Sequence, residues 1–289
     1  MPENMIKLRE VTSVTGNLAG ICKNAPQSGD PIWTRIWNET SGMARTEPIL
    51  AGYLNDTVLR HNSLDAAIAD LLSGKLASSY LPVEVLRDVI KEALYMSAKI
   101  RLAVRRDLDA FVDRDPAARG LAQPFLNYKG FHALQSYRVA NWLWGEGREP
   151  LALHLQNRVS EVFDVDIHPA AVIGKGILID HGAGVVIGET AVVGDDVSLL
   201  HEVTLGGSGK VSGDRHPKVG SGVLIGAGAK ILGNVRIGTG SKVMAGSVVL
   251  SDVPPHCTVA GIPATVVGRP NSAKPALQMD HWLEPDFCI

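Results

Sequence analysis

The chain has 289 residues, of which 45% are hydrophobic and 20% charged, and its formal net charge is −2. This balance is typical of a globular protein and argues against a nucleic-acid or anionic-membrane partner. The three cysteines, Cys22, Cys257 and Cys288, lie far apart, so neither a disulfide framework nor a CxxC metal site is expected. This cysteine pattern predicts a protein of the reducing cytoplasm. With no run of 18 apolar residues, we expect no membrane-spanning helix.

The N-terminal half is predicted to be helical. Residues 1–30 lack the apolar core of a signal peptide and are expected to form a flexible extension. Residues 31–163 carry apolar stripes at helical spacing and are predicted to form one helical domain. Within it, Ser63 is placed to cap a helix that Gly74 stops, and Asp115-Pro116 ends a later helix.

From Ile167 to Val253, an aliphatic residue recurs at six-residue intervals, with two breaks. A period of six fits neither a helix nor an ordinary strand and is typical of a parallel β-helix with a triangular cross-section. We therefore predict an α+β fold, in which the N-terminal all-α helical domain precedes a left-handed parallel β-helix of hexapeptide repeats over residues 164–268. The recurring residues are Ile167, Ile173, Ile179, Ile187, Val193, Leu199, Leu205, Val219, Ile225, Ile231, Ile237, Val243 and Val249.

The two breaks in the repeat are candidate functional positions. The step from Ile179 to Ile187 is eight residues, and the step from Leu205 to Val219 is fourteen. The longer insertion, 206–218, is polar and carries Arg, His and Asp. An excursion from a rigid solenoid is either a tolerated surface loop or a place where binding groups are attached, and we favour the second interpretation.

The C-terminal end of the repeat is marked by prolines. Pro263 cannot donate to a strand ladder, so the chain is expected to turn away from the solenoid after Val259. Residues 269–289 are expected to form a flexible tail. The tail ends in Phe287-Cys288-Ile289, and such an apolar end is either accidental or a docking peptide for a partner.

Histidines in the repeat offer metal or proton-transfer chemistry. In that region no two of His181, His201 and His216 lie within five residues of each other, so no metal site is expected. Asp166 and His181 are fifteen residues apart, which leaves them near the same prism edge on a coil of about 18 residues. They are either a general base with its orienting carboxylate or a surface histidine beside acids.

Motifs in both halves of the chain resemble one enzyme family. They are Arg114–Pro116, Tyr128–Gln135, Val139–Trp144, Asp166–Ala171, Gly174–Gly176, Asp180-His181, Gly188–Ala191, Val203–Gly207, Gly213–Lys218, Gly226–Asn234 and Ala260–Ala264. Together they resemble the serine O-acetyltransferases among the hexapeptide-repeat acyltransferases, over about residues 31–268. Two departures are His181-Gly-Ala-Gly184, where the family has His-Ala-Thr-Gly, and Met244 in place of a glycine.

The resemblance implies the reaction and its base. It implies acetyl transfer from acetyl-CoA to the hydroxyl of L-serine, the first step of cysteine biosynthesis, with L-cysteine as inhibitor. His181 would be the general base and Asp166 its orienting partner. A serine hydroxyl is a weak nucleophile that must lose its proton as it attacks, and a histidine suits that task.

The resemblance also assigns the serine-binding residues. Arg215 and His216 would bind the serine carboxylate. Asp115 and Asp180 would lie on the ammonium and hydroxyl side. Because Asp115 comes from the helical domain, that domain would be part of the active site.

For acetyl-CoA, the resemblance implies a groove between adjacent prisms. Backbone groups around Ala227, Gly228 and Ala245 would bind the pantetheine arm, and Lys230 would face the phosphates. This groove implies a homotrimer, with the helical domains joining two trimers into a hexamer. The tail ending in Ile289 would insert into O-acetylserine sulfhydrylase.

Two other functions are compatible with a bare hexapeptide repeat. One is an acetyltransferase for another small hydroxyl substrate, such as homoserine or a sugar. The other is a non-catalytic assembly module that presents the C-terminal tail.

Overall fold

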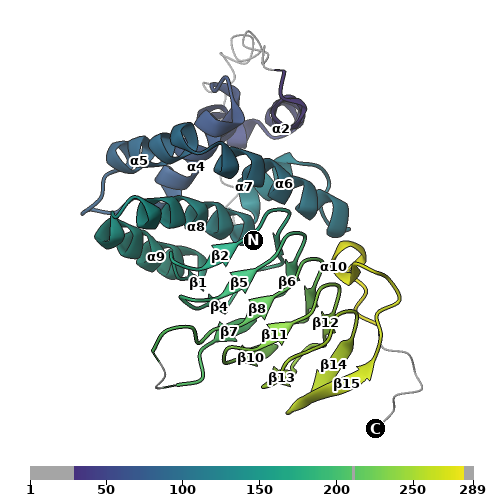
Figure 1. Cartoon of the computed structure of the whole chain (residues 1–289). Helices are drawn as coiled ribbons and strands as arrows, with labels where there is room; N and C mark the ends of the chain where they lie inside the picture. Colours follow the sequence, from purple (N-terminus) through teal and green to yellow (C-terminus); the bar gives the residue numbers. More distant parts are fainter. Residues whose placement is uncertain (1–28, 210–211, 283–289) are drawn as a thin grey trace, which may run out of the picture.

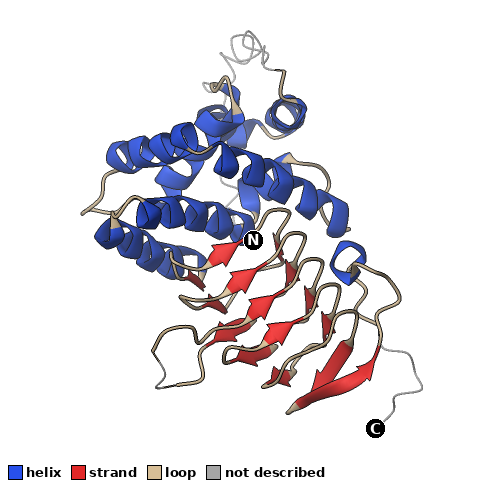
Figure 2. Ribbon diagram, in the orientation of Figure 1, coloured by secondary structure: helices blue, strands red, loops and turns tan. Residues whose placement is uncertain are grey.

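The computed structural model describes residues 29–209 and 212–282, and it places a helical layer on one end of a β-solenoid (Figure 1). Figure 2 shows that helices and strands are segregated, apart from one short helix beside the solenoid. Of the predicted extension over residues 1–30, residues 1–28 lie outside the described residues, as does the tail end at Ile289, and Asp30 caps the first helix.

The helical part follows the predicted caps with one exception. The Ser63 hydroxyl accepts a hydrogen bond from the Ala66 amide and caps its helix as predicted. The prediction that Gly74 stops this helix is wrong, because the helix continues to Leu76, which is fully buried. The helices are α2 (Pro31–Thr46), a 3₁₀ turn (Pro48–Leu50), α3 (Ala51–Leu54), a π-turn (Asn55–Leu59), α4 (Leu64–Leu76), α5 (Val83–Met96), α6 (Ala98–Arg114), α7 (Ala122–Asn127), α8 (Lys129–Gly145) and α9 (Glu149–Phe163).

The solenoid consists of three sheets, and each of the first four coils of the chain adds one strand to each sheet. Sheet A contains β1 (Val165–Ile167), β4 (Val185–Ile187), β7 (Thr204–Gly206), β10 (Lys230–Leu232) and β13 (Val248–Val249). Sheet B contains β2 (Val172–Ile173), β5 (Val192–Val193), β8 (Lys218–Val219) and β11 (Arg236–Ile237). Sheet C contains β3 (Leu178–Ile179), β6 (Ser198–Leu199), β9 (Leu224–Ile225), β12 (Lys242–Val243), β14 (Thr258–Gly261) and β15 (Ala264–Gly268). We call the turns from A to B, B to C and C to A the A–B, B–C and C–A edges.

The six-residue repeat produces the core of the solenoid. Every recurring aliphatic residue named above is buried, with at most 6% of its surface exposed. Each such side chain contributes about 1.5–3 kcal/mol by leaving water. The pairs between successive coils are parallel, as in Ile187 beside Leu205. The predicted helical region followed by a parallel β-helix is thus confirmed.

The register breaks appear as longer coils. Lys218 pairs with Arg236, an offset of 18 residues. Val165 pairs with Val185, an offset of 20, and Val192 pairs with Lys218, an offset of 26. Both insertions therefore leave the strand ladder intact, because the extra residues are accommodated in turns at the C–A and A–B edges.

Helix α8 joins the helical layer to the first coil through polar side chains. The Tyr137 hydroxyl donates to the carbonyl of Ala171 at 2.5 Å, and Asn141 Nδ2 donates to the same carbonyl at 3.1 Å. Arg138 Nη2 donates to the Gly174 carbonyl at 2.7 Å. Buried polar groups are costly unless they are paired, so these bonds fix one docking position.

Helix α6 adds a second set of contacts. Asp107 is fully buried and accepts from Arg138 Nε at 2.9 Å and from the Ile177 amide at 3.0 Å. At the end of α6, Arg114 Nη1 donates to the Val197 carbonyl and to the Ser198 hydroxyl. These bonds hold the C-terminal end of α6 against sheet C.

The chain after the repeat differs from the prediction. Val259 still pairs in parallel with β12, and the turn at Pro263 leads into β15, which runs antiparallel to β14. The expected departure at Val259 is therefore a hairpin. Proline is tolerated there because it lies between the strands and not within a ladder.

Residues 269–282 also differ from the expected flexible tail. They return along sheet C and form α10 (Pro275–Gln278), which lies close to α6 in Figure 1. Ala276 is fully buried, and its carbonyl accepts from the Ser198 hydroxyl at 2.9 Å. Lys242, whose side chain is 3% exposed, forms an ion pair with Asp280 at 3.3 Å. Ser198 and Lys242 are outward-facing polar residues of sheet C, and their contacts with Ala276 and Asp280 hold the segment.

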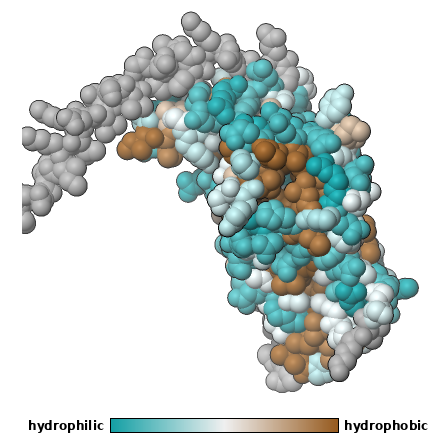
Figure 3. All heavy atoms as spheres, turned by 90° about the vertical axis from the view of Figure 1, so that its left-hand side faces the viewer, coloured by the Kyte–Doolittle hydropathy of each residue, from teal (hydrophilic) through white to brown (hydrophobic). Residues whose placement is uncertain are grey.

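The outer surface of the other two sheets is partly apolar. Val172 and Val192 on sheet B and Val186 on sheet A are between 37% and 54% exposed. Figure 3 shows apolar side chains gathered in a band along the solenoid in that view. Within the described residues, none of the helices has the length and apolar character needed to cross a membrane.

Candidate active site

The turn after β3 carries the proposed base. Asp180 and His181 occupy the C–A edge of the first coil, where the chain contains the two-residue insertion. His181 has a φ of 58°, a left-handed conformation that is uncommon outside glycine. Its side chain is 76% exposed, and its Nε2 lies 3.9 Å from Asp180 Oδ1. The imidazole is thus available to a substrate.

Asp115 joins these two residues in a pocket of about 410 Å³ between the helical layer and the first coil. Asp115 is the C-cap of α6, and the neighbouring Arg114 anchors this helix end to sheet C. The pocket is lined by Asp115, Ala117, Asn127, Tyr128, Lys129, Gly130, Ile179, Asp180 and His181. The structure therefore brings together three of the predicted site residues, two carboxylates and a histidine.

Tyr128 is a polar residue of this pocket that lies in one of the motifs named above but was not assigned to the site. Its hydroxyl accepts a hydrogen bond from Gln123 Nε2 at 3.0 Å. The pKa of Tyr128 is raised to about 12 by burial, by the charge of Asp115 and a hydrogen bond to it, and by the charge of Asp180. The phenol is therefore neutral at working pH and can donate its proton in a hydrogen bond.

Arg215 and His216 lie on a different edge. They belong to the long insertion after β7, at the A–B edge, and Thr190 of the preceding coil holds them there. The Thr190 hydroxyl accepts from both backbone amides, at 3.0 Å from Arg215 and 3.1 Å from His216. The Arg215 guanidinium donates to Glu189 at 2.6 Å.

Electrostatics at the A–B edge keep the histidines neutral. The pKa of His216 is lowered, mainly by burial and then by the Arg215 charge. The pKa of His168 is also lowered, mainly by burial, against opposing effects of Glu189 and Asp166. The pKa of Glu189 is lowered, chiefly by its hydrogen bond from Arg215. This edge thus presents a guanidinium and neutral imidazoles.

Asp166 lies on the outer face of sheet A. Its neighbours in β1 point into the core, and its carboxylate accepts from Gln156 Nε2 at 2.6 Å. Within the described residues, no hydrogen bond or ion pair joins Asp166 to His181. The sequence placed both near one prism edge. In a single chain, however, the alternation of β1 directs Asp166 outward between the edges, so their pairing stays a prediction.

The residues proposed for acetyl-CoA follow the same edge as His181. Ala227, Gly228 and Ala245 occupy successive C–A turns below it. The Gly228 amide donates to the His201 carbonyl at 2.9 Å, and the Ala227 carbonyl accepts from Gly246 at 2.8 Å, so the turns form a continuous ladder. Lys230 begins the adjacent strand β10 and donates to the Glu202 carbonyl.

His201 is a further residue of this edge that was not assigned to the site. Its ring lies 5.9 Å from that of His181, measured between centroids, one coil below. The 20-residue spacing of the two histidines equals the offset between the first two coils. That signal was available in the sequence, because an 18-residue coil with a two-residue insertion gives this spacing. Tyr128 and Lys129 lie in the motif Tyr128–Gln135, but no spacing in the sequence connects them with His181.

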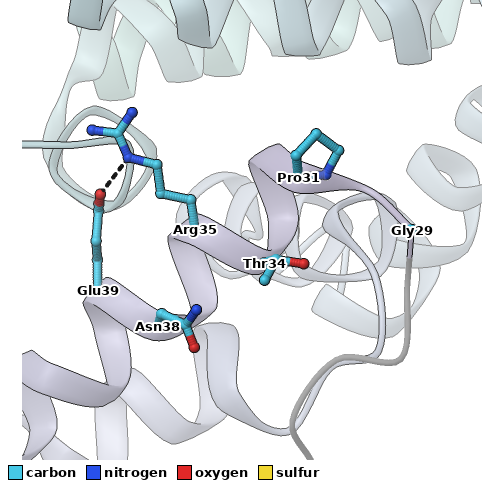
Figure 4. Close-up of a pocket in the computed structure, with 6 residues that line it drawn as sticks. All are labelled: Gly29, Pro31, Thr34, Arg35, Asn38 and Glu39. Atoms are coloured by element: carbon cyan, nitrogen blue, oxygen red, sulfur yellow. Dashed lines mark hydrogen bonds and ion pairs between the residues drawn. The ribbon is translucent and has the colours of Figure 1, made fainter.

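Neither a ligand site beside α2 nor a metal site is supported by the described residues. A hollow of about 460 Å³ lies beside α2, lined by Gly29, Pro31, Thr34, Arg35, Asn38 and Glu39. Figure 4 shows Arg35 and Glu39 turned toward each other, and Glu39 also accepts from the Ala122 amide. The Glu39 carboxylate is thus already paired within the chain. In residues 29–209 and 212–282, no cluster of three His, Cys, Asp or Glu side chains is arranged to hold a metal ion.

Comparison with known proteins identifies relatives of both halves. The family described as "Serine acetyltransferase, N-terminal" matches residues 32–136, and "Bacterial transferase hexapeptide (six repeats)" matches residues 216–251. The serine acetyltransferase of Salmonella typhimurium is 52% identical over 250 residues, which are 86% of this chain and 92% of the relative. The crystal structure of the Vibrio cholerae serine acetyltransferase is 53% identical, with a TM-score of 0.86, covering 87% of this chain and 97% of that one.

Similar structures have been solved with ligands. A Neisseria gonorrhoeae serine acetyltransferase in complex with serine is 51% identical, with a TM-score of 0.80, over 83% of this chain and 98% of that one. A Brucella abortus enzyme in complex with coenzyme A is 48% identical, with a TM-score of 0.81, over 83% and 96%. A serine acetyltransferase in complex with cysteine is 49% identical, with a TM-score of 0.86, over 88% and 98%.

Proposed function

The chain belongs to the serine acetyltransferase family, and we propose that it transfers the acetyl group of acetyl-CoA to L-serine at the C–A edge, with His181 as general base. It is a serine O-acetyltransferase, it uses acetyl-CoA as co-substrate, and O-acetyl-L-serine and CoA are its products. The observation that carries the assignment of the site is the pocket in which His181 faces Asp115 and Asp180.

His181 performs the proton transfers in this proposal. Its imidazole takes the proton of the serine hydroxyl as the oxygen attacks the thioester carbonyl carbon. The new C–O bond replaces the C–S bond, and the proton held on the imidazole passes to the leaving thiolate. The exposure of the ring and its left-handed backbone support this role, because both present the imidazole to the pocket.

The two carboxylates of the pocket suit the other end of the substrate. Asp115 and Asp180 are the acceptors for the serine ammonium, on the side of the site where the hydroxyl meets His181. A zwitterion also needs a cation for its carboxylate, and we assign Arg215 to this role, with the neutral imidazole of His216 as a second hydrogen-bond donor to the same carboxylate. The paired interaction of Arg215 with Glu189 orients the guanidinium before substrate binds.

This assignment requires a second copy of the chain. In one chain His181 lies at the C–A edge and Arg215 at the A–B edge, on opposite sides of sheet A. Bringing the C–A edge of one prism against the A–B edge of the next completes the site. Such contact joins two different surfaces and closes as a ring, which supports a trimer for a triangular prism. Asp166 of the neighbouring copy would then orient His181.

Variants of the base and the guanidinium test this proposal together. His181→Ala should abolish thiol release from acetyl-CoA with L-serine, and near-normal turnover would remove the proposed base. Co-expressing His181→Ala chains with Arg215→Ala chains should restore about a quarter of wild-type activity, because about one in four interfaces in randomly mixed rings carries both native groups. No recovery in mixed rings would place both groups in one chain's site.

L-cysteine inhibits by binding at the serine site, which its near-identical shape allows; a relative has been solved with cysteine. We further propose a hexamer of two trimers joined by the helical domains, in the cytoplasm. The apolar end at Ile289, outside the described residues, would dock into O-acetylserine sulfhydrylase. Deleting residues 287–289 should abolish that binding in a calorimetric titration, and unchanged affinity would exclude the docking role.

A further inference from the structure

We infer that Tyr128 is a positioning residue of the serine site, which holds the Asp115 carboxylate in place to receive the serine ammonium. The inference rests on the proposed function and deepens it. Tyr128 lines the pocket together with Asp115, Asp180 and His181. It comes from the turn between α7 and α8, so it belongs to the helical layer, as Asp115 does.

The ring of Tyr128 has a fixed position. Tyr128 is the N-cap of α8, with an extended backbone at φ −89° and ψ 110°. Its ring meets Phe111 edge-on, with 5.8 Å between centroids. Phe111 is buried and lies on α6, one turn before Asp115. The aromatic contact therefore ties the phenol to the helix that carries the carboxylate.

The hydroxyl has a defined hydrogen-bond direction. Gln123 Oε1 accepts from the Arg119 amide at 2.8 Å, which orients the Gln123 side-chain amide. Gln123 Nε2 therefore donates to the Tyr128 hydroxyl, at 3.0 Å. An oxygen that accepts on one side is left with its own proton to donate. We assign Asp115 as the receiving group, because it lines the same pocket and its negative charge raises the pKa of the Tyr128 hydroxyl.

Asp115 is then held from two sides. Its Oδ1 accepts from the Ala117 amide at 2.8 Å, which closes the turn after α6. We assign the Tyr128 hydroxyl as the second donor, which limits the rotation of the carboxylate. Asp180 on the solenoid is the other carboxylate of the pocket. A short chain of donors, from the Arg119 amide through Gln123 and Tyr128, thus sets the position of Asp115 relative to Asp180.

The test is Tyr128→Phe, which keeps the ring and its contact with Phe111. The KM for serine should rise about tenfold, since a hydrogen bond to a charged group is lost, while kcat and the KM for acetyl-CoA stay within about twofold. Cysteine binding, measured by calorimetry without turnover, should weaken by a similar factor because its ammonium uses the same site. The matched control is Tyr80→Phe, at a tyrosine that is 90% exposed on the helical surface and should behave as wild type.

A double-mutant cycle separates positioning from a general structural effect. In an Asp115→Asn background, Tyr128→Phe should change the serine KM by less than about twofold, because the group it positions has lost its charge. A full tenfold rise in that background would overturn the inference. So would a Tyr128→Phe enzyme with unchanged serine KM and cysteine affinity, or one that loses kcat alone. A wild-type chain that binds cysteine but does not acetylate serine would instead overturn the proposed function.

Discussion

The contact between helix α8 and the turn of the base allows a sharp test of how the helical layer controls the site. A methyl group added at Gly130 would lie 2.0 Å from the carbonyl oxygen of Ile179, the residue before Asp180. Ordinary contact begins at 3.4 Å, so Gly130→Ala requires a shift of about 1.4 Å (3.4 − 2.0). The obstacle is backbone, and no side-chain rotation can relieve it.

The shift is transmitted to the catalytic turn because Ile179 directly precedes it. Overpacking of this kind costs about 1–3 kcal/mol of stability, and a displacement of about 1 Å at a reacting group costs about a hundredfold in rate. Gly130→Ala should therefore lower the thermal midpoint and reduce kcat/KM for serine by about a hundredfold. Thiol release from acetyl-CoA measures the rate, and scanning calorimetry measures the midpoint.

The matched control is Gly145→Ala in the same helix. A methyl group there meets nothing within 4 Å, so the change should leave kcat unaltered and raise stability by about 0.5–1 kcal/mol. If Gly130→Ala has the same kcat and midpoint as Gly145→Ala, the close approach does not position the turn, and the reasoning fails.

Two further predictions concern stability. Burial lowers the pKa of His132 to about 4, so the imidazole is neutral in the folded protein. The free energy of unfolding is therefore highest above about pH 6.5, and up to ~3 kcal/mol of it is lost as the pH falls toward 4. His132→Gln should flatten the loss of urea stability between pH 7.5 and 5, and an unchanged slope would exclude this source. Asp280→Ala removes the partner of buried Lys242, which should release residues 269–282 to limited proteolysis while the solenoid stays intact. Cleavage at the wild-type rate would show that the ion pair does not hold the segment.

Most of the fold could be predicted from the sequence because the solenoid follows from a short repeat of neighbouring residues. A six-residue period fixes which side chains enter the core, and Ile167 and its successors are all buried as expected. The helix ends were less certain: Gly74 lies inside α4 because the burial of Leu76 outweighs the cost of a mid-helix glycine. Residues 269–282 were mistaken for a free tail, because their polar contacts with sheet C have no periodic signature.

The residues of the candidate site were predictable, but their grouping was predictable only in part. Asp115, Asp180 and His181 do meet in one pocket, although Asp115 is far from the others in sequence. The fifteen-residue spacing on a coil of about 18 residues suggested that Asp166 approaches His181. Within one chain, however, the Asp166 carboxylate accepts a hydrogen bond from Gln156. Spacing along a coil gives the edge near which a residue lies, whereas the direction of its side chain depends on strand alternation and on neighbouring helices.

The two ends of the β-helix have a consequence for growth of the stack. A parallel solenoid is open-ended, and its terminal coils offer strand edges to which another chain could add. Here the first coil lies beneath α8 and α9, which occupy that end in Figure 1. At the other end β15 runs antiparallel to β14, so an incoming parallel coil would meet a strand of opposite direction. The length of the solenoid is therefore set within the chain, and end-to-end polymerisation into fibres is disfavoured.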